Sequence, residues 1–175
     1  MPLRLMDMKS GAPGLTSEVG AFYAQAASVC LEDQGHSSPT PMLISGELTA
    51  SATLEWATTT DQVRRNWKDD EEATEYGACA IASLLVPELS GLHVVERSRK
   101  GTGFDYWLGP TDDDESLFQS RARLEVSGLR AGTETRIAAR VRKKLRQTER
   151  SDSSLLPAVV VIVEFSQPES RVAKR

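Results

Sequence analysis

Three acidic residues and a serine form the pattern in this sequence that is best suited to chemistry. Asp105 lies in the segment GFDYWL, Glu125 and Ser127 lie in RLEVS, and Glu75 precedes both segments. Each segment alternates apolar and polar residues as a strand does, so its carboxylate projects opposite the large apolar side chains. Two carboxylates on neighbouring strands can bind a hard cation such as Mg²⁺ through oxygen. Such an ion can polarise a phosphoryl oxygen and generate hydroxide.

A purely structural explanation also exists for each acid. A carboxylate on an amphipathic strand is usually the solvent-facing residue of a half-buried sheet, and acids such as Glu75 are common on helix surfaces. The joint occurrence of Asp105 and Glu125, in this order and each in a strand-like segment, favours a site. The sequence leaves both explanations open.

The elements that would position these acids follow from the hydrophobic periodicity. We expect, in order, a helix over 18–34, a hairpin of strands 42–47 and 52–56, a helical stretch from residue 60 with a break near 68–72 and an end at Pro87, strands 92–98, 104–108 and 122–127, a helix over 134–150, and a buried strand over 158–165. Residues 1–14 show no sustained period and predict a flexible N-terminal arm. Residues 15–175 then form a single α/β domain.

This order, with GxGFD opening one strand and Glu-x-Ser on the next, resembles the PD-(D/E)XK superfamily of restriction-endonuclease-like nucleases. The resemblance covers about residues 62–166 and implies an αβββαβ core, a mixed sheet flanked by helices, with an extra N-terminal helix and hairpin. It implies Mg²⁺ bound by Asp105, Glu125 and a helix acid, Glu75 or alternatively Glu72. It also implies hydrolysis of DNA phosphodiester bonds, in defence against or processing of foreign DNA.

The sequence departs from the family pattern at one position. Ser127 stands where the family has lysine, and a hydroxyl can hydrogen-bond a water but brings no positive charge. We expect the cation to come from Lys143 or Lys144 on the basic helix, or from Lys100 in the Gly-rich turn. The expected catalytic set is Asp105, Glu125, Ser127 and Lys144. If no cation reaches the site, the chain is a catalytically inactive nuclease-fold adaptor or interaction subunit.

Charge is divided unevenly along the chain. The formal net charge is −4, yet residues 1–120 hold 8 Lys and Arg against 19 Asp and Glu, while residues 121–150 hold 10 against 3. The basic helix over 134–150 therefore predicts either a phosphate-binding face or a docking face for an acidic partner. The expected nucleic-acid-binding residues are Lys100, Arg136, Arg140, Lys143 and Arg146.

Composition narrows the classes of protein to which the chain can belong. With 39% hydrophobic residues and only Cys30 and Cys79, the chain needs no disulfides, and we expect both cysteines to be buried thiols. Its longest apolar runs are well short of the roughly 20 residues that cross a bilayer, and no signal-peptide pattern opens the sequence, so we expect a cytoplasmic protein with no membrane partner.

The sequence also predicts an acidic loop over residues 111–115. Exposed apolar residues in the N-terminal hairpin, Trp56 among them, suggest a homodimer or a protein partner.

Overall fold

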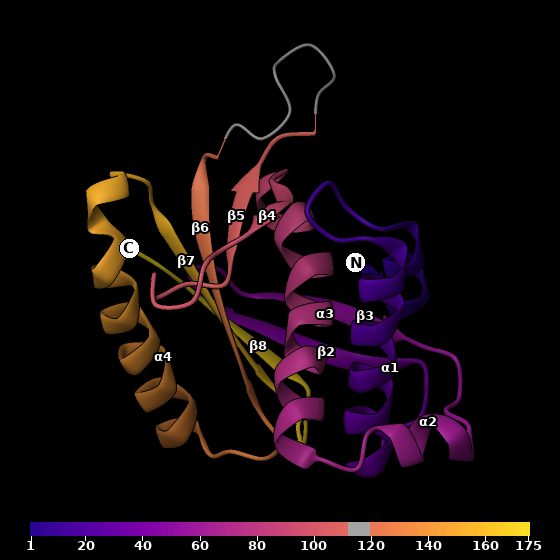
Figure 1. The fold of residues 1–175 in the computed structure, drawn as a ribbon. Coiled ribbons are helices and arrows are strands. Elements are labelled where there is room, and N and C mark those ends of the chain that lie inside the picture. Colours follow the sequence, from indigo (N-terminus) through magenta and orange to yellow (C-terminus); the bar gives the residue numbers. More distant parts are fainter. Residues whose placement is uncertain (112–119) are drawn as a thin grey trace.

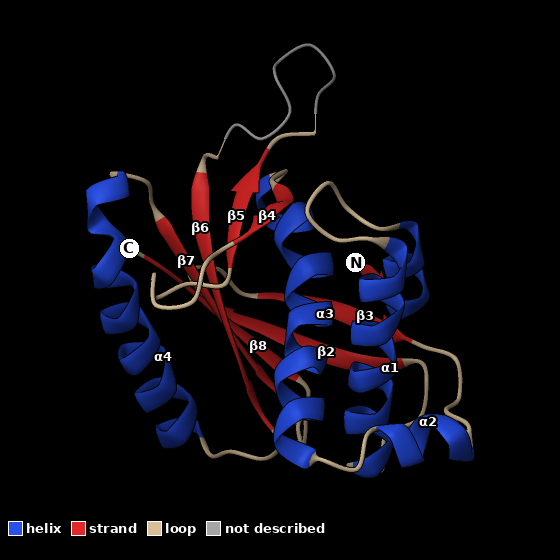
Figure 2. Ribbon diagram, viewed as in Figure 1, coloured by secondary structure: helices blue, strands red, loops and turns tan. Residues whose placement is uncertain are grey.

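One mixed sheet runs through the protein, with helices on both of its faces (Figures 1 and 2). The computed structural model describes residues 1–111 and 120–175, and there the sheet has eight strands in the order β1-β3-β2-β8-β7-β6-β5-β4. The strands are β1 (Pro2–Arg4), β2 (Thr40–Gly46), β3 (Ala50–Glu55), β4 (His93–Arg97), β5 (Tyr106–Gly109), β6 (Ala122–Leu129), β7 (Ala158–Glu164) and β8 (Glu169–Lys174). Most of the predicted acidic loop lies outside the described residues.

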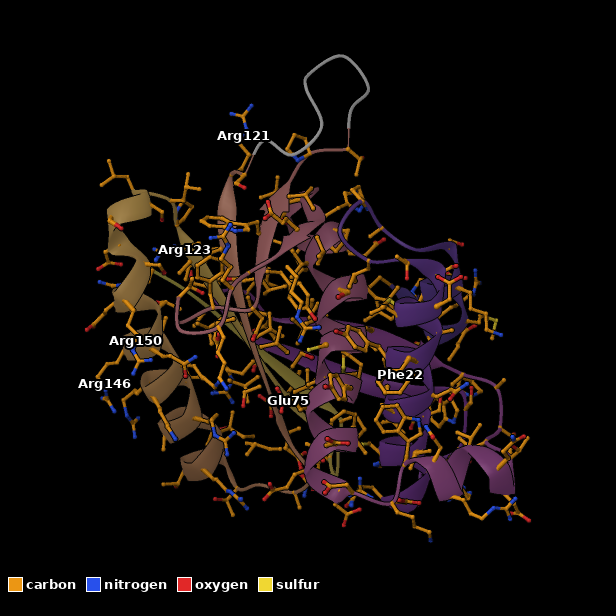
Figure 3. All side chains as sticks on the ribbon, viewed as in Figure 1. Phe22, Glu75, Arg121, Arg123, Arg146 and Arg150 are labelled. Carbon is orange, nitrogen blue, oxygen red and sulfur yellow. The ribbon has the colours of Figure 1, made fainter. Side chains whose placement is uncertain are left out.

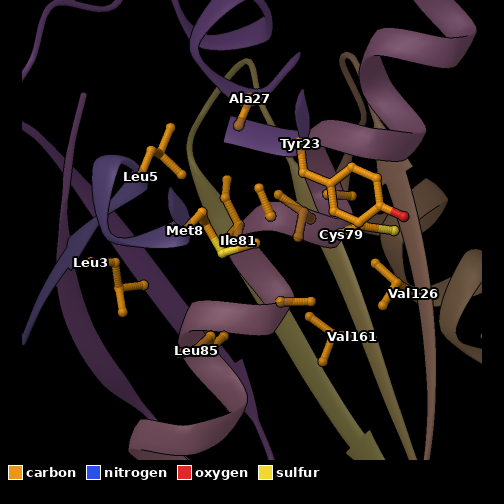
Figure 4. Close-up of a cluster of buried hydrophobic side chains, with 14 of the residues drawn as sticks. Leu3, Leu5, Met8, Tyr23, Ala27, Cys79, Ile81, Leu85, Val126 and Val161 are labelled. Carbon is orange, nitrogen blue, oxygen red and sulfur yellow. The ribbon is translucent and has the colours of Figure 1, made fainter. Parts of the chain in front are cut away.

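The helices form two layers around this sheet. Helices α1 (Ser17–Asp33) and α3 (Asp70–Ser90), with the short α2 (Asp61–Asn66), lie on one face, and α4 (Glu134–Thr148) lies on the other (Figure 1). Two 3₁₀ helices, η1 (Leu5–Ser10) and η2 (Glu149–Ser154), complete the described elements. The main core fills the space between α1, α3 and the sheet, where Tyr23, Ile81 and Val161 are buried together (Figure 4).

Local sequence explains where the long helices begin. Thr16 accepts a hydrogen bond from the amide of Val19 at the start of α1, and Thr133 does the same for Arg136 at the start of α4. Asp69 caps α3 by accepting from two amides of its first turn, so the predicted break between α2 and α3 is confirmed. The capping residues therefore fix the N-terminal ends of α3 and α4, the two helices that flank the candidate site.

The central run α3-β4-β5-β6-α4-β7 has the predicted helix, three strands, helix and strand order. Strands β4, β5 and β6 pair in antiparallel fashion, whereas β6 and β7 are parallel, with Glu125 opposite Val160. The connection from β6 through α4 to β7 therefore crosses one face of the sheet and places α4 there. The mixed α/β sheet flanked by helices is confirmed.

Three expectations about the elements are corrected. Residues 1–14 are not a loose arm, because β1 pairs with β3 and the side chains of Leu3, Leu5 and Met8 are buried. Helix α3 does not end at Pro87 but continues to Ser90, with a left-handed Gly91 as its C-cap. Strand β8 is inserted between β7 and β2 although the sequence analysis expected no strand there.

Strand β6 is covered on both faces. Its Val126 belongs to the main core, and on its other face Leu129 packs with Ile137 of α4 and with Val160 and Ile162 of β7. The alternation of β6 was predicted correctly, but its polar face is not exposed to solvent because α4 lies over it. Polar residues on that face, Glu125 among them, are therefore buried.

The structure also bears on the predictions for the cysteines, for Trp56 and for membrane-spanning segments. Cys30 and Cys79 are buried free thiols, as predicted. Trp56 is buried and donates a hydrogen bond to Glu32, so it is not an exposed dimer contact, although Leu43 in the same hairpin is 48% exposed. Among the described residues, no helix is both long enough and apolar enough to cross a membrane.

Candidate active site

A cleft of about 660 Å³ lies between the N-terminal half of α3 and helix α4. Strand β6 lines it from Glu125 to Leu129, and Asp105 lines it from the residue immediately before β5. All the predicted catalytic and metal-binding residues line this single cleft: Glu75, Asp105, Glu125, Ser127 and Lys144. In Figure 3, Glu75 is labelled on α3, on the side toward α4.

The cleft opens because β5 pairs with only the first part of β6. Backbone pairing with β5 covers residues 122–124, whereas pairing with β7 continues to Leu129. Asp105 lies where the β5 pairing stops: its amide donates to the carbonyl of Leu124, and its Oδ2 accepts from the amide of Val126, both at 2.8 Å. A carboxylate thus replaces a strand carbonyl, and the edge of β6 beyond it faces the cleft.

Gly103 allows the chain to reach Asp105 across the end of α4. Its φ is +86°, and a Cβ at this position would lie 2.2 Å from the carbonyl oxygen of Gln147 on α4. The Gly-rich turn therefore packs against α4 and fixes Asp105 relative to that helix. Lys100, in the same turn, is exposed and does not line the cleft, so it is not brought to the predicted site.

Glu125 is the most constrained of the acids. It is 1% exposed, and its Oε1 accepts hydrogen bonds from Nζ of Lys144 and, at 2.9 Å, from Nε2 of Gln147. Its Oε2 is buried and has no hydrogen-bond partner. An unpartnered buried carboxylate oxygen is costly unless a ligand or cation satisfies it, so this atom marks the point where the cleft is incomplete.

The surroundings of Glu125 shift the pKa of its carboxyl strongly. Burial raises the pKa of its carboxyl to about 7, with the neighbouring Asp105 carboxylate adding to the rise, although the ammonium of Lys144 acts in the opposite direction. The Glu125 carboxyl therefore titrates near neutral pH. Shifts of this kind occur more often at functional sites than at structural ones.

The raised pKa predicts a pH-dependent stability for the metal-free protein. The folded-state pKa of Glu125 exceeds its ordinary value of 4.5, so its stabilising contribution is complete below pH 4.5 and is lost as pH rises through about 7. Relative to Glu125→Gln, which cannot titrate, we expect the free energy of unfolding of the wild type to fall by up to roughly 3 kcal/mol across that range. Urea unfolding in EDTA at pH 5 and pH 8 measures this, and a constant difference between the two proteins would contradict it.

The residues present fit a divalent cation with oxygen ligands. The unpartnered Oε2 of Glu125 on β6 and the carboxylate of Asp105, immediately before β5, provide two anionic oxygens, and Glu75 adds an exposed carboxylate on the α3 side of the cleft. Within residues 1–111 and 120–175, no three acidic, histidine or cysteine side chains already lie together as a ready-made ligand set. The fit thus rests on the pair of Asp105 and Glu125.

Helix α4 brings positive charge into the cleft. Lys144 contacts Glu125, and Nη1 of Arg140 donates to the Ser127 hydroxyl at 2.7 Å. Of the other predicted nucleic-acid-binding residues, Arg136 lines the cleft, whereas Lys143 and Arg146 are exposed and do not. Two cations from α4 therefore reach the cleft, Lys144 at Glu125 and Arg140 at Ser127.

One polar contact of Glu125 was not predicted from the sequence. Gln147 reaches Glu125 from α4, one helical turn after Lys144, and its amide forms half of the hydrogen bonding to Oε1. A neutral amide gives no charge pattern, and only its spacing of three residues from Lys144 could have suggested it.

The fold and the cleft define a class of protein. It is an α/β protein with two neighbouring carboxylates where β5 stops pairing with β6, and with basic side chains of α4 beside them. No protein-family model matches the chain, and neither does any curated protein or solved structure. The chemistry of the cleft itself is therefore the basis for assigning a function.

Proposed function

We propose that this protein is a metal-dependent nuclease that hydrolyses DNA phosphodiester bonds in the cleft between α3 and α4. The observation that carries the proposal is the buried Glu125, with one oxygen bonded by Lys144 and Gln147, the other without a partner, and Asp105 beside it. The antiparallel β4-β5-β6 pairing followed by the parallel β7 supports a restriction-endonuclease-like core.

The residues of the cleft divide the proposed reaction between them. Asp105 and Glu125 would hold Mg²⁺ through their carboxylate oxygens, with Glu75 facing it from α3. The ion, when bound, supplies polarisation of a phosphoryl oxygen and a lowered pKa for a water. The ammonium of Lys144 would stabilise the negative charge that develops on the phosphate, and Arg140, held by Ser127, would bind the adjacent phosphate oxygen.

A second candidate is a non-catalytic adaptor with the same fold. Lys144 already neutralises Glu125, Ser127 replaces the family lysine, and no group of three ligands stands assembled in the described part of the chain. In that case the cleft would bind no metal, and the basic helix would dock a protein partner or a second copy. Co-purification with a partner, together with no heat of Mg²⁺ binding, selects this candidate.

Cleavage assays separate the two candidates. Wild-type protein is expected to cut DNA with Mg²⁺ and not with EDTA, and Asp105→Ala and Glu125→Ala are each expected to remove this activity. Glu72→Ala is the matched control, because Glu72 is an exposed acid of α3 that does not line the cleft. Cleavage that persists in either cleft variant, or no cleavage of any nucleic acid by the wild type, would overturn the nuclease proposal.

A further inference from the structure

Helix α4 carries basic side chains on two opposite flanks. Arg140 and Lys144 line the cleft. Arg142 and Arg146 each follow one of these residues by two positions, which is about 200° around an α-helix, so they lie on the opposite flank. The apolar stripe that packs on the sheet lies between the two flanks on one side, and solvent lies between them on the other.

Four exposed cations on α4 and just after it have no side-chain partner among the described residues. Arg142, Lys143, Arg146 and Arg150 are exposed, and none of their side chains forms a hydrogen bond or ion pair with another described residue. Figure 3 shows Arg146 and Arg150 on the outer side of α4, away from the sheet. Concentrated charge of one sign without internal partners is costly to maintain, and it attracts an external polyanion.

A single nucleic-acid strand cannot contact both flanks. A helix with its side chains is about 10–12 Å across, so a backbone that follows the cleft stays on the side of Arg140 and Lys144. The major groove of duplex DNA is about 12 Å wide and admits an α-helix, with one phosphate backbone on each side. The spacing of the two flanks therefore matches two backbones and not one.

The surroundings of α4 determine on which side a duplex can lie. Glu71 and Glu75 are exposed on the α3 wall of the cleft and would repel a second phosphate backbone there. Beyond the far flank, α4 packs on β6, β7 and β8, and the next strand, β2, presents Leu43 with 48% of its surface exposed. Negative charge therefore disfavours a second backbone on the α3 side, and the sheet beyond the far flank is uncovered at Leu43.

We infer that α4 occupies the major groove of duplex DNA, with one strand in the cleft beside Asp105 and the other along Arg142 and Arg146. The strand in the cleft rests on the proposed nuclease function, whereas the contact of the far flank does not. Lys143 and Arg150, between the two flanks, would lie nearest the base edges. The partner is a double-stranded polyanion rather than a single strand or an acidic protein.

Binding measurements in EDTA test this inference without cleavage. A fluorescent 20-base-pair duplex and its single strand are titrated with wild type and with the Arg142→Gln/Arg146→Gln double variant. We expect this variant to weaken duplex binding about 10-fold, to reduce the slope of log affinity against log salt by about 2, and to leave single-strand binding within 2-fold. Arg65→Gln/Lys68→Gln, which removes two exposed cations near α2, is the matched control and should change neither.

Each outcome decides the inference. Equal weakening of duplex and single strand would mean that one strand follows α4, and no weakening of either would mean that the far flank serves a different partner; both results overturn it. Failure of the nuclease proposal can be distinguished from failure of the groove contact. A protein that shows the duplex pattern but never cuts DNA retains the groove contact and loses the catalytic function, while a protein that cuts DNA without the pattern does the reverse.

Discussion

Lys144→Met is expected to lower kcat for Mg²⁺-dependent DNA cleavage by about 10²–10³-fold, the usual effect of removing one group that stabilises charge in a transition state. Lys144 is the ammonium that contacts Glu125, and Ser127 cannot replace its charge. Mg²⁺ affinity at pH 8.5 should stay within about 10-fold of the wild-type value, because loss of a neighbouring cation favours a divalent ion and offsets any loss of positioning. Single-turnover cleavage and calorimetry measure the two effects.

Lys143→Met is the matched control for this prediction. It removes the same charge from the adjacent position, but Lys143 is exposed and does not line the cleft. Its effect should appear in KM and in salt dependence, with kcat nearly unchanged. Equal kcat losses in the two variants would mean that Lys144 acts only through the overall charge of α4.

Glu125→Gln is expected to weaken Mg²⁺ binding by at least about 100-fold and to reduce cleavage by more than about 10³-fold. The amide nitrogen cannot ligate a hard cation, and the side chain loses the charge that Oε2 offers to the cleft. The variant should nevertheless remain folded, because replacing the buried carboxylate also removes the cost of its ionisation above pH 7.

Glu164→Gln provides a matched control for loss of a buried glutamate. Glu164 is 2% exposed in β7, and it accepts hydrogen bonds from the amides of Gly132, Ser166 and Gln167 outside the cleft. Its substitution should lower stability and leave Mg²⁺ affinity unchanged. If both variants lost metal binding equally, the effect of Glu125→Gln would reflect damage to the sheet and not loss of a ligand.

The sequence predicted those parts of the fold that have strong local signals. Helices α1 and α4 have threonine caps and apolar stripes, and β7 is a run of β-branched residues, so each was located within a few residues. Asp105 and Glu125 line one cleft, as the alternation of their segments suggested, although Asp105 precedes β5 and does not belong to the predicted strand 104–108. These features depend on neighbours in sequence, and local reasoning can find them.

The features that the sequence did not predict depend on contacts between distant segments. Strand β8 has few apolar residues, and it forms because β7 and β2 offer backbone partners on both sides. Glu125 looked solvent-facing because nothing local shows that α4 covers that face of β6. The bond from Gln147 to Glu125 joins residues 22 positions apart on different elements. Tertiary packing decided all three.

A Mn²⁺-soaked crystal of the wild-type protein, with anomalous diffraction recorded at the manganese edge, would show whether Asp105 and Glu125 bind a divalent ion. We predict one ion in the cleft between α3 and α4, with Oε2 of Glu125 and a carboxylate oxygen of Asp105 both within about 2.0–2.6 Å of it. Absence of an ion there at millimolar Mn²⁺, or an ion bound elsewhere with Oε2 of Glu125 still unpartnered, would show that these carboxylates are not a metal site.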